Sequence, residues 1–172
     1  KDDRAQKYLN GHPSLNTITP VSFLGRQFPS LWRRNLRNDL VKNKIELFHG
    51  LSHEIPYGLK KNGIKSVVTI HDLIFMRYPE YFPMIDRKVY LSKVKHAIKE
   101  SDKIISICEQ TKKDLMNFLK VDESKIEVCY QSCGTAFGDE WHPSQIDNLK
   151  NKYNLTKDYF LYVGALEERK NI

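Results

Sequence analysis

The chain contains only 3 cysteines in 172 residues, and it has no long apolar run. A helix that crosses a bilayer needs roughly 20 consecutive apolar residues, and no segment approaches that length. The three thiols, at Cys108, Cys129 and Cys133, are too few and too irregularly spaced for a disulfide framework or a zinc site. These absences argue against an integral membrane protein and a disulfide-stabilised secreted domain. We expect packed thiols in a reducing compartment.

Glycine-rich nucleotide motifs are also missing. None of the 8 glycines lies in a G-x-G-x-x-G, P-loop or G-x-S-x-G pattern. This disfavours a dinucleotide-binding half, an ATPase and a serine hydrolase. The first residues, KDDRAQKYLNG, lack the apolar core of a secretion signal and resemble the middle of a longer gene product. We therefore expect a cytoplasmic protein.

Positive charge dominates the chain, with a net charge of +7, and is concentrated from Arg26 to Lys44. That segment carries six Lys or Arg side chains and one acid, interleaved with apolar residues. Such a basic amphipathic stretch can lie peripherally on the anionic inner membrane surface. The alternative is an ordinary surface helix whose apolar stripe faces the core. Beyond Trp32 the segment lacks the aromatic-basic signature of nucleic-acid binding, so we expect no nucleic-acid partner.

Short apolar runs alternate with helical patterns along the chain. Strands are predicted at residues 17–23, 45–48, 66–70, 103–107, 126–130 and 160–163. Helices are predicted at residues 30–41, 90–98 and 111–119 and after a capping Ser144, and Thr111 with Asp114 resembles a capping box. Most of the strand runs are continuously apolar, which is typical of strands buried on both faces of a parallel sheet. The pattern predicts an α/β fold, a Rossmann-like parallel sheet with flanking helices that binds ligands beyond the carboxyl ends of its strands.

Polar side chains follow one of the predicted strands at its carboxyl end. The run Ser66–Ile70 leads directly into His71 and Asp72, an imidazole beside a carboxylate. A histidine at this edge can donate to a phosphate or a sugar hydroxyl, and the adjacent acid tunes its protonation. The alternative is that both side chains merely bond to loop backbone. We interpret the pair as candidate catalytic residues.

Two other predicted strand ends carry polar side chains. His49 follows the strand at residues 45–48, and Ser52 and His53 come shortly after it. The two histidines have a metal-like spacing, but a glycine loop separates them, so we interpret them as substrate-lining or structural residues and expect no metal. Glu109 follows the strand at residues 103–107, where it either lines the same crevice or satisfies the dipole of the next helix.

The sequence YFLYVGALEERKNI suggests an anion site near the end of the chain. An apolar run meets Gly164, and Arg169 and Lys170 stand where the next helix should begin. Helix amino termini carry unpaired backbone donors, so cations added there suit a phosphate or diphosphate.

Five blocks in order resemble the retaining family 4 glycosyltransferases of the GT-B fold, also called glycosyl transferases group 1. The blocks are FHGLSHEIP, VVTIHDLIFMRYPEYFP, SDKIISICEQTKKDL, KIEVCYQSC and YFLYVGALEERKNI. The resemblance implies two Rossmann-like domains that face each other across a cleft. Residues 1–157 would form the amino-terminal acceptor-side domain, without the family's first strand and glycine-rich loop. Residues 158–172 would form the first strand and loop of the donor-binding domain, which the chain leaves truncated.

The resemblance also implies roles for individual residues. His71 would contact the transferred sugar and donor phosphate, with Asp72 beside it, and Arg169 and Lys170 would meet the donor diphosphate in place of a metal. The full-length protein would move a sugar from a nucleotide-diphosphate donor to a saccharide or lipid-linked acceptor with retention, and it would need no cofactor. We expect this polypeptide alone to be inactive. A non-catalytic sugar-phosphate or anion-binding module of the same fold is the alternative.

Overall fold

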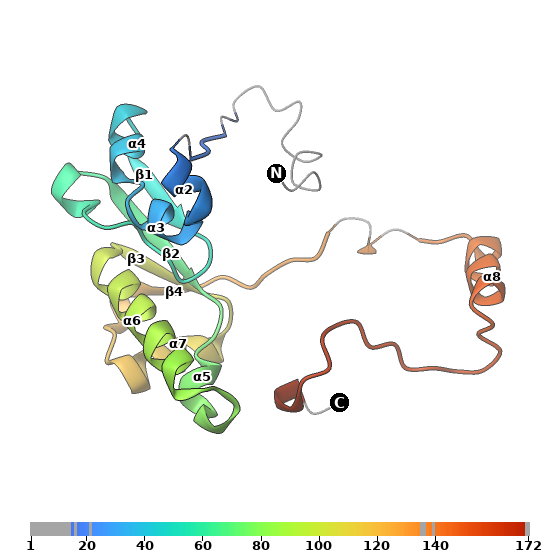
Figure 1. The fold of residues 1–172 in the computed structure, drawn as a ribbon. Coiled ribbons are helices and arrows are strands. Elements are labelled where there is room, and N and C mark those ends of the chain that lie inside the picture. The colour runs from blue at the N-terminus through green and yellow to red at the C-terminus, as the bar shows by residue number, and fades with distance from the viewer. Residues whose placement is uncertain (1–14, 16, 21, 135–136, 139, 171–172) are drawn as a thin grey trace.

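Four parallel strands form the centre of the structure, a computed structural model that describes residues 15, 17–20, 22–134, 137–138 and 140–170 (Figure 1). The strands are β1 (Leu47–Gly50), β2 (Lys65–Ile70), β3 (Lys103–Ser106) and β4 (Ile126–Val128). They lie in the order β1-β2-β3-β4, and every neighbouring pair is parallel. Because parallel strands all end at one edge, the loops after them meet there.

Helices connect and flank these strands. Before β1 lie α2 (Phe23–Gln27), α3 (Pro29–Arg34) and α4 (Arg37–Lys42). The connection from β1 to β2 contains η1 (Lys60–Asn62), and the one from β2 to β3 contains α5 (Ile74–Arg77), η2 (Pro79–Tyr81) and α6 (Met84–Glu100). Between β3 and β4 lie α7 (Glu109–Leu119) and η3 (Glu123–Lys125). After β4 come α8 (Pro143–Lys152) and η5 (Glu168–Lys170).

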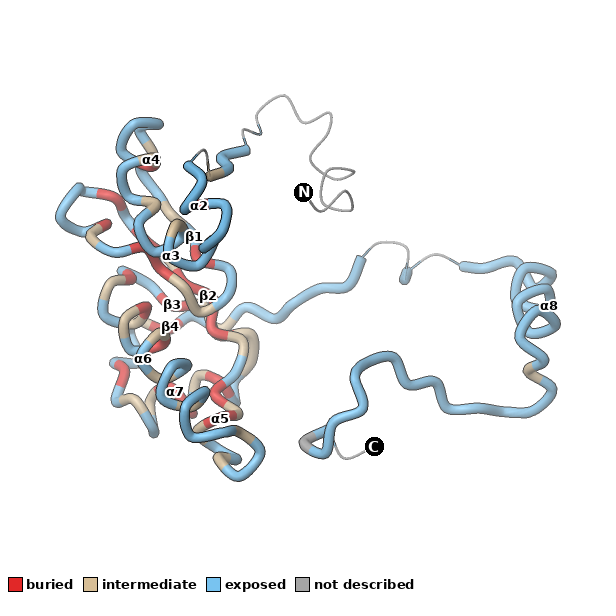
Figure 2. The backbone as a smooth tube through the Cα atoms, in the orientation of Figure 1, coloured by how far each residue is buried: buried red, intermediate tan, exposed pale blue. Residues whose placement is uncertain are grey.

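The hydrophobic core joins the central strands to the helices beside them (Figure 2). Val68 and Ile70 of β2 and Ile104 of β3 are fully buried, and Val94 of α6 and Leu115 of α7 pack with them. Continuous apolar strands are buried in this way when helices cover a parallel sheet. The predicted Rossmann-like α/β fold is therefore confirmed.

Two predictions for the amino-terminal part are wrong. Residues 17–20 form no strand, and Phe23 begins α2 because the Ser22 hydroxyl caps it, accepting from the Gly25 amide at 3.1 Å. Pro20 also lacks the amide donor that a strand ladder needs. Val21 and residues 1–14 lie outside the described residues. The single helix predicted over residues 30–41 is two short helices, α3 and α4, separated by a turn at Asn35.

The segment after β4 also differs from the predictions. Residues 160–163 form no strand, because no described strand lies beside them to pair with their backbone groups. The capping box of α8 is built by His142 and Gln145, so Ser144 lies inside the first turn rather than at the cap. Beyond Val128, every residue whose burial is described is exposed except Leu155 (Figure 2). A second domain from residue 158 stays a prediction.

Candidate active site at the carboxyl edge of the sheet

Two loops meet at the carboxyl edge, one after β1 and one after β2. β2 ends at Ile70, so His71 and Asp72 follow it directly, as the sequence predicted. The loop after β1 folds back onto β2, where the His53 amide donates to the Thr69 carbonyl at 3.1 Å. Gly50 permits this return, because a Cβ at that position would lie only 2.1 Å from the Glu54 carbonyl oxygen.

Three hydrogen bonds hold His71 in this half-buried place. Its amide donates to His53 Nε2 at 2.8 Å, and its carbonyl accepts from the Thr111 hydroxyl at 2.9 Å. Its ring Nε2 lies 2.9 Å from the Leu51 carbonyl. Because a carbonyl only accepts, Nε2 carries the hydrogen, and Nδ1 of the neutral ring is an acceptor. Both the backbone and the ring of His71 are therefore fixed before any ligand arrives.

His53 is held as a neutral imidazole. Its Nε2 accepts from a backbone amide, which can only donate, so the ring hydrogen lies on Nδ1. Burial lowers the pKa of His53, an effect that His71 and Lys93 reinforce and that Asp72 and Glu54 oppose. The sequence interpretation offered a substrate-lining or a structural role for His53. The structure shows a structural one, because this side chain supports the backbone at the end of β2.

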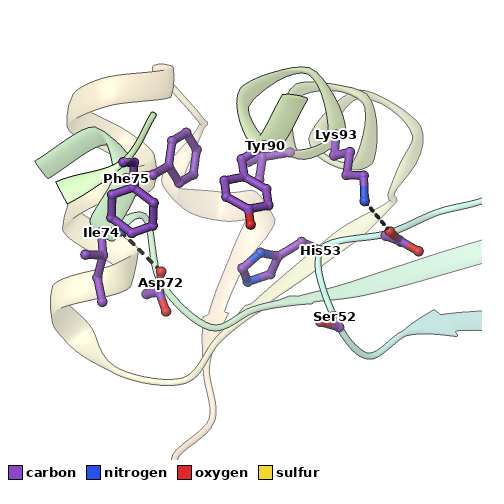
Figure 3. Close-up of a pocket in the computed structure, with 10 residues that line it drawn as sticks. Ser52, His53, Asp72, Ile74, Phe75, Tyr90 and Lys93 are labelled. Atoms are coloured by element: carbon purple, nitrogen blue, oxygen red, sulfur yellow. Dashed lines mark hydrogen bonds and ion pairs between the residues drawn. The ribbon is translucent and has the colours of Figure 1, made fainter. Parts of the chain in front are cut away.

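A cavity of about 290 Å³ opens beside this pair of loops (Figure 3). The His53 ring projects into it, with Asp72 on one side and Tyr90 of α6 on another. Ser52 and Lys93 add further polar groups, and the apolar part of the wall is formed by Ile74, Phe75, Phe82 and Val94. Apolar walls with a few convergent polar groups are typical of small-molecule sites. Hydroxyl, carboxylate and ammonium groups suit a polyhydroxylated ligand.

The Asp72 carboxylate accepts one hydrogen bond from the backbone and can accept others from a ligand. Its Oδ1 accepts from the Ile74 amide at 3.2 Å and so stabilises the turn into α5. The side chain is exposed at the cavity wall. Since a carboxylate accepts several hydrogen bonds, Asp72 can still bind a ligand hydroxyl.

Glu54 links the loop after β1 to two helices. Its carboxylate pairs with Lys93 of α6 at 2.8 Å and with Arg33 of α3 at 3.3 Å. Burial by itself raises the pKa of Glu54, but the two cations outweigh it and hold the pKa below its ordinary value. Sequence reasoning assigned no role to Glu54, Lys93 or Tyr90. The two α6 residues follow no strand, so the strand-end rule did not lead to them.

Three residues predicted for this edge do not line the cavity. His71 lies between the two loops, but its side chain, bonded to the Leu51 carbonyl, is not part of the cavity wall. His49 belongs to β1 rather than to the loop after it, and its Nε2 lies 2.9 Å from the Thr69 hydroxyl. Glu109 is the exposed first residue of α7, the first-turn position that the sequence offered as the alternative. Neither residue lines the cavity of about 290 Å³.

The capping box predicted for α7 is wrong. Thr111 and Asp114 lie within the helix, and the Thr111 hydroxyl bonds to His71 of the neighbouring loop. Asp114 is buried and accepts hydrogen bonds from Arg77 and Gln110. α7 therefore directs polar side chains toward the strand-end loop instead of capping itself.

The candidate anion site is not brought to the carboxyl edge in this structure. Gly164 and Lys170 are exposed in the segment that extends from the sheet, and Arg169 lies in η5 (Figure 1). The Lys170 ammonium lies 6.0 Å from the centre of the Tyr162 ring. The diphosphate role of these three residues stays a prediction.

The described residues contain neither a candidate metal-binding cluster nor a candidate membrane-spanning helix. No group of three or more His, Cys, Asp or Glu side chains is arranged to hold a metal ion there. None of the helices in the described part of the chain is both long enough and apolar enough to cross a lipid bilayer.

Comparison with known proteins relates this geometry to sugar-transferring enzymes. The chain is 28% identical over 131 residues to an O-antigen chain mannosyltransferase B of Escherichia coli, covering 75% of this chain and 33% of that protein. It is 24% identical over 144 residues to serotype-specific mannosyltransferase WbdA of Escherichia coli, covering 80% of this chain and 17% of that protein. The chain thus spans a third or less of the length of these relatives.

The sequence model of one family covers most of the folded region. It matches residues 2–132, which include all four strands and both loops of the candidate site. The match is to the family described as Glycosyltransferase Family 4. The chain belongs to glycosyltransferase family 4 and contains its amino-terminal portion.

Proposed function

We propose that the whole protein transfers a sugar from a nucleotide-diphosphate donor to a saccharide or lipid-linked acceptor with retention of configuration. The observation that carries the proposal is the cavity of Ser52, His53 and Asp72 at the carboxyl edge of the sheet, in a member of this family. The named relatives are mannosyltransferases, and one acts on the O-antigen chain, so we propose mannose as the donor sugar and a polysaccharide as the product.

The proposed chemistry breaks the bond between the anomeric carbon and the diphosphate and forms a new glycosidic bond on the same face. The acceptor hydroxyl gives its proton to the departing diphosphate. Asp72 would accept a hydrogen bond from a sugar hydroxyl, and Nδ1 of His71 would orient a hydroxyl or, when protonated, donate to the donor phosphate. Arg169 and Lys170 would neutralise the leaving group without a divalent metal. We place the reaction in the cytoplasm, the compartment expected from the sequence.

A transfer assay on the full-length protein tests the proposal. Radiolabelled mannose on a nucleoside diphosphate is offered with a saccharide acceptor, and the anomeric configuration of the product is determined by NMR. Asp72→Asn should lower kcat about 10- to 100-fold, because it weakens the hydrogen bond to the reacting sugar. The matched control Asp86→Asn, on the exposed first turn of α6, should leave the rate unchanged. Absence of both transfer and donor hydrolysis across common donors would instead favour a non-catalytic binding module, and inhibition by EDTA would refute the metal-free mechanism.

We also propose that α2 and α3 bind an anionic membrane surface. Phe23, Leu24, Phe28 and Leu31 expose between 53% and 74% of their surface, and Arg26 lies among them. Exposed apolar residues next to cations suit a bilayer interface that carries acidic lipids. The chain should bind phosphatidylglycerol vesicles at low ionic strength, bind neutral vesicles weakly, and lose binding as salt rises. If a Leu24→Ser, Phe28→Ser variant binds the phosphatidylglycerol vesicles as well as the unaltered chain does, α2 and α3 are ordinary surface helices.

A further inference from the structure

A second cavity lies next to the candidate active site, between α3 and α6. Its volume is about 320 Å³, and its walls include Arg34 of α3, Tyr57 of the loop after β1, and Lys93 and His96 of α6. Lys93, together with His53 and Glu54, also lines the first cavity. The two cavities are therefore neighbours that share one wall, and one extended ligand can reach from one to the other.

Positive charge exceeds negative charge around this second cavity. Glu54 is the only acid among the described residues that line it, and this carboxylate is already paired with Lys93 and with Arg33. Arg34 has no carboxylate partner within the described part of the chain. Two cations, Arg34 and Lys93, line the cavity against one carboxylate and leave an excess of one positive charge, and a partly enclosed site strengthens its attraction for an anion.

Arg34 is fixed in place by an aromatic ring. Its guanidinium lies 5.0 Å from the centre of the Tyr57 ring and donates to the Tyr57 hydroxyl. The opposing ring of His96 lies 4.0 Å from that of Tyr57, centre to centre, and His96 Nε2 bonds to the Ile55 carbonyl at 3.2 Å. A guanidinium has five N–H donors in a planar fork. Most of them remain for a ligand, and the ordering cost is reduced because the ring already orients the group.

We propose that this second cavity binds an oxyanion on the acceptor, with Arg34 as the principal contact. The proposal rests on the proposed function, since the acceptor hydroxyl would then lie in the first cavity near Asp72. The oxyanion is either the phosphate of a phosphorylated or lipid-linked saccharide or the carboxylate of an acidic sugar. Recognition of this group would select acceptors before the sugar donor is engaged.

Binding of small anions to the chain tests the proposal without any transfer reaction. Mannose 1-phosphate and inorganic phosphate represent the phosphate source, glucuronic acid represents the carboxylate source, and methyl mannoside is the neutral comparison. Amide NMR shifts report where each probe binds, and titration gives its affinity. We expect the anions, and not methyl mannoside, to shift the amides of Arg34, Tyr57 and His96. Tighter binding of the phosphates or of glucuronic acid identifies which source the cavity fits.

Three variants make the test specific. Arg34→Gln should weaken anion binding about 10- to 100-fold, because a charge-assisted hydrogen bond is lost. Tyr57→Phe keeps the ring but releases the guanidinium, and should weaken binding less. Arg87→Gln removes an arginine of α6 that does not line the cavity, and should leave the affinity unchanged. Each variant is checked by thermal unfolding to show that it is folded.

Two results would overturn the proposal. One is equal anion affinity of the unaltered chain and the Arg34→Gln variant, and the other is a set of shifted amides that lies outside the α3–α6 cavity. Failure of sugar transfer in the full-length protein would leave these binding measurements intact. The two proposals can therefore fail separately.

Discussion

The hydrogen bond from the His71 amide to His53 Nε2 gives the sharpest test of the site geometry. His53→Ala removes the acceptor and leaves the amide at the end of β2 without a partner. An unpaired buried donor costs about 1–3 kcal/mol. Because His71 is only half-buried, we expect the lower part of this range, about 1–2 kcal/mol of unfolding free energy.

His53→Gln is the matched variant. Its side-chain oxygen reaches about as far as Nε2 and accepts a hydrogen bond, so most of the stability should return. Both variants keep a Cβ at a position whose φ is 58°, so the same left-handed backbone cost applies to each. The difference between them therefore isolates the acceptor. Urea unfolding followed by circular dichroism at pH 7.5 measures it.

The pH dependence provides a second measurement of the same bond. The unfolded chain binds a proton on His53 with the ordinary pKa of about 6.5, while burial lowers the pKa in the folded state. Between these two values the unfolded state holds more protons, so stability falls as pH falls below about 6.5. His96, whose pKa burial also lowers, contributes a slope of the same sign. His53→Gln should thus flatten the dependence between pH 7.5 and 5.5 without abolishing it.

Two results would refute this reasoning about His53. One is equal stability of His53→Ala and His53→Gln at pH 7.5. The other is the same pH dependence in the unaltered chain and the His53→Gln variant. Imidazole nitrogen shifts in NMR offer an independent check, because the geometry requires the hydrogen of His53 on Nδ1 and that of His71 on Nε2.

Two further substitutions test how the neighbouring elements are held. Arg77→Ala should destabilise the chain more than Asp114→Ala in urea unfolding. The first leaves a buried carboxylate without its cation, whereas the second leaves a more exposed cation without its carboxylate. The reverse order would contradict the role of burial. Gly50→Ala should lower the free energy of unfolding by about 1–3 kcal/mol and shift the backbone amide signal of Glu54, since the new methyl group clashes with that residue's carbonyl. Unchanged stability would show that the loop after β1 adapts freely.

The fold could be predicted because short apolar runs alternate with helical patterns in the sequence. The run Ser66–Ile70 is centred on Val67 and Val68 and ends at Ile70, and the structure buries most of it as part of β2. The runs at residues 17–23 and 160–163 also contain apolar residues, yet none of their described residues lies in a strand. An apolar composition favours a strand, but a strand also needs a neighbouring strand to pair with its backbone groups. The pattern of a single sequence does not show whether that neighbour is present.

Only those residues of the candidate site that directly follow a strand could be predicted from the sequence. The sequence led to His71 and Asp72 because parallel strands deliver their following residues to one edge. It did not lead to the three bonds that hold His71, which join residues 18, 20 and 40 positions apart. Nor did it lead to the Glu54–Lys93 pair, whose partners are 39 positions apart. Such partners are set by how α6 and α7 pack on the sheet, so they follow from tertiary structure and not from local spacing.

The bond to the His71 amide explains why His53 is neutral at a place where burial lowers its pKa. β2 ends where its amide and carbonyl lose their strand partners, and an edge that must stay open to a ligand offers no further strand. His53 and the Thr111 hydroxyl complete the pairing from opposite sides. The backbone is thereby satisfied without closing the edge, and the cavity beside it remains available to a substrate.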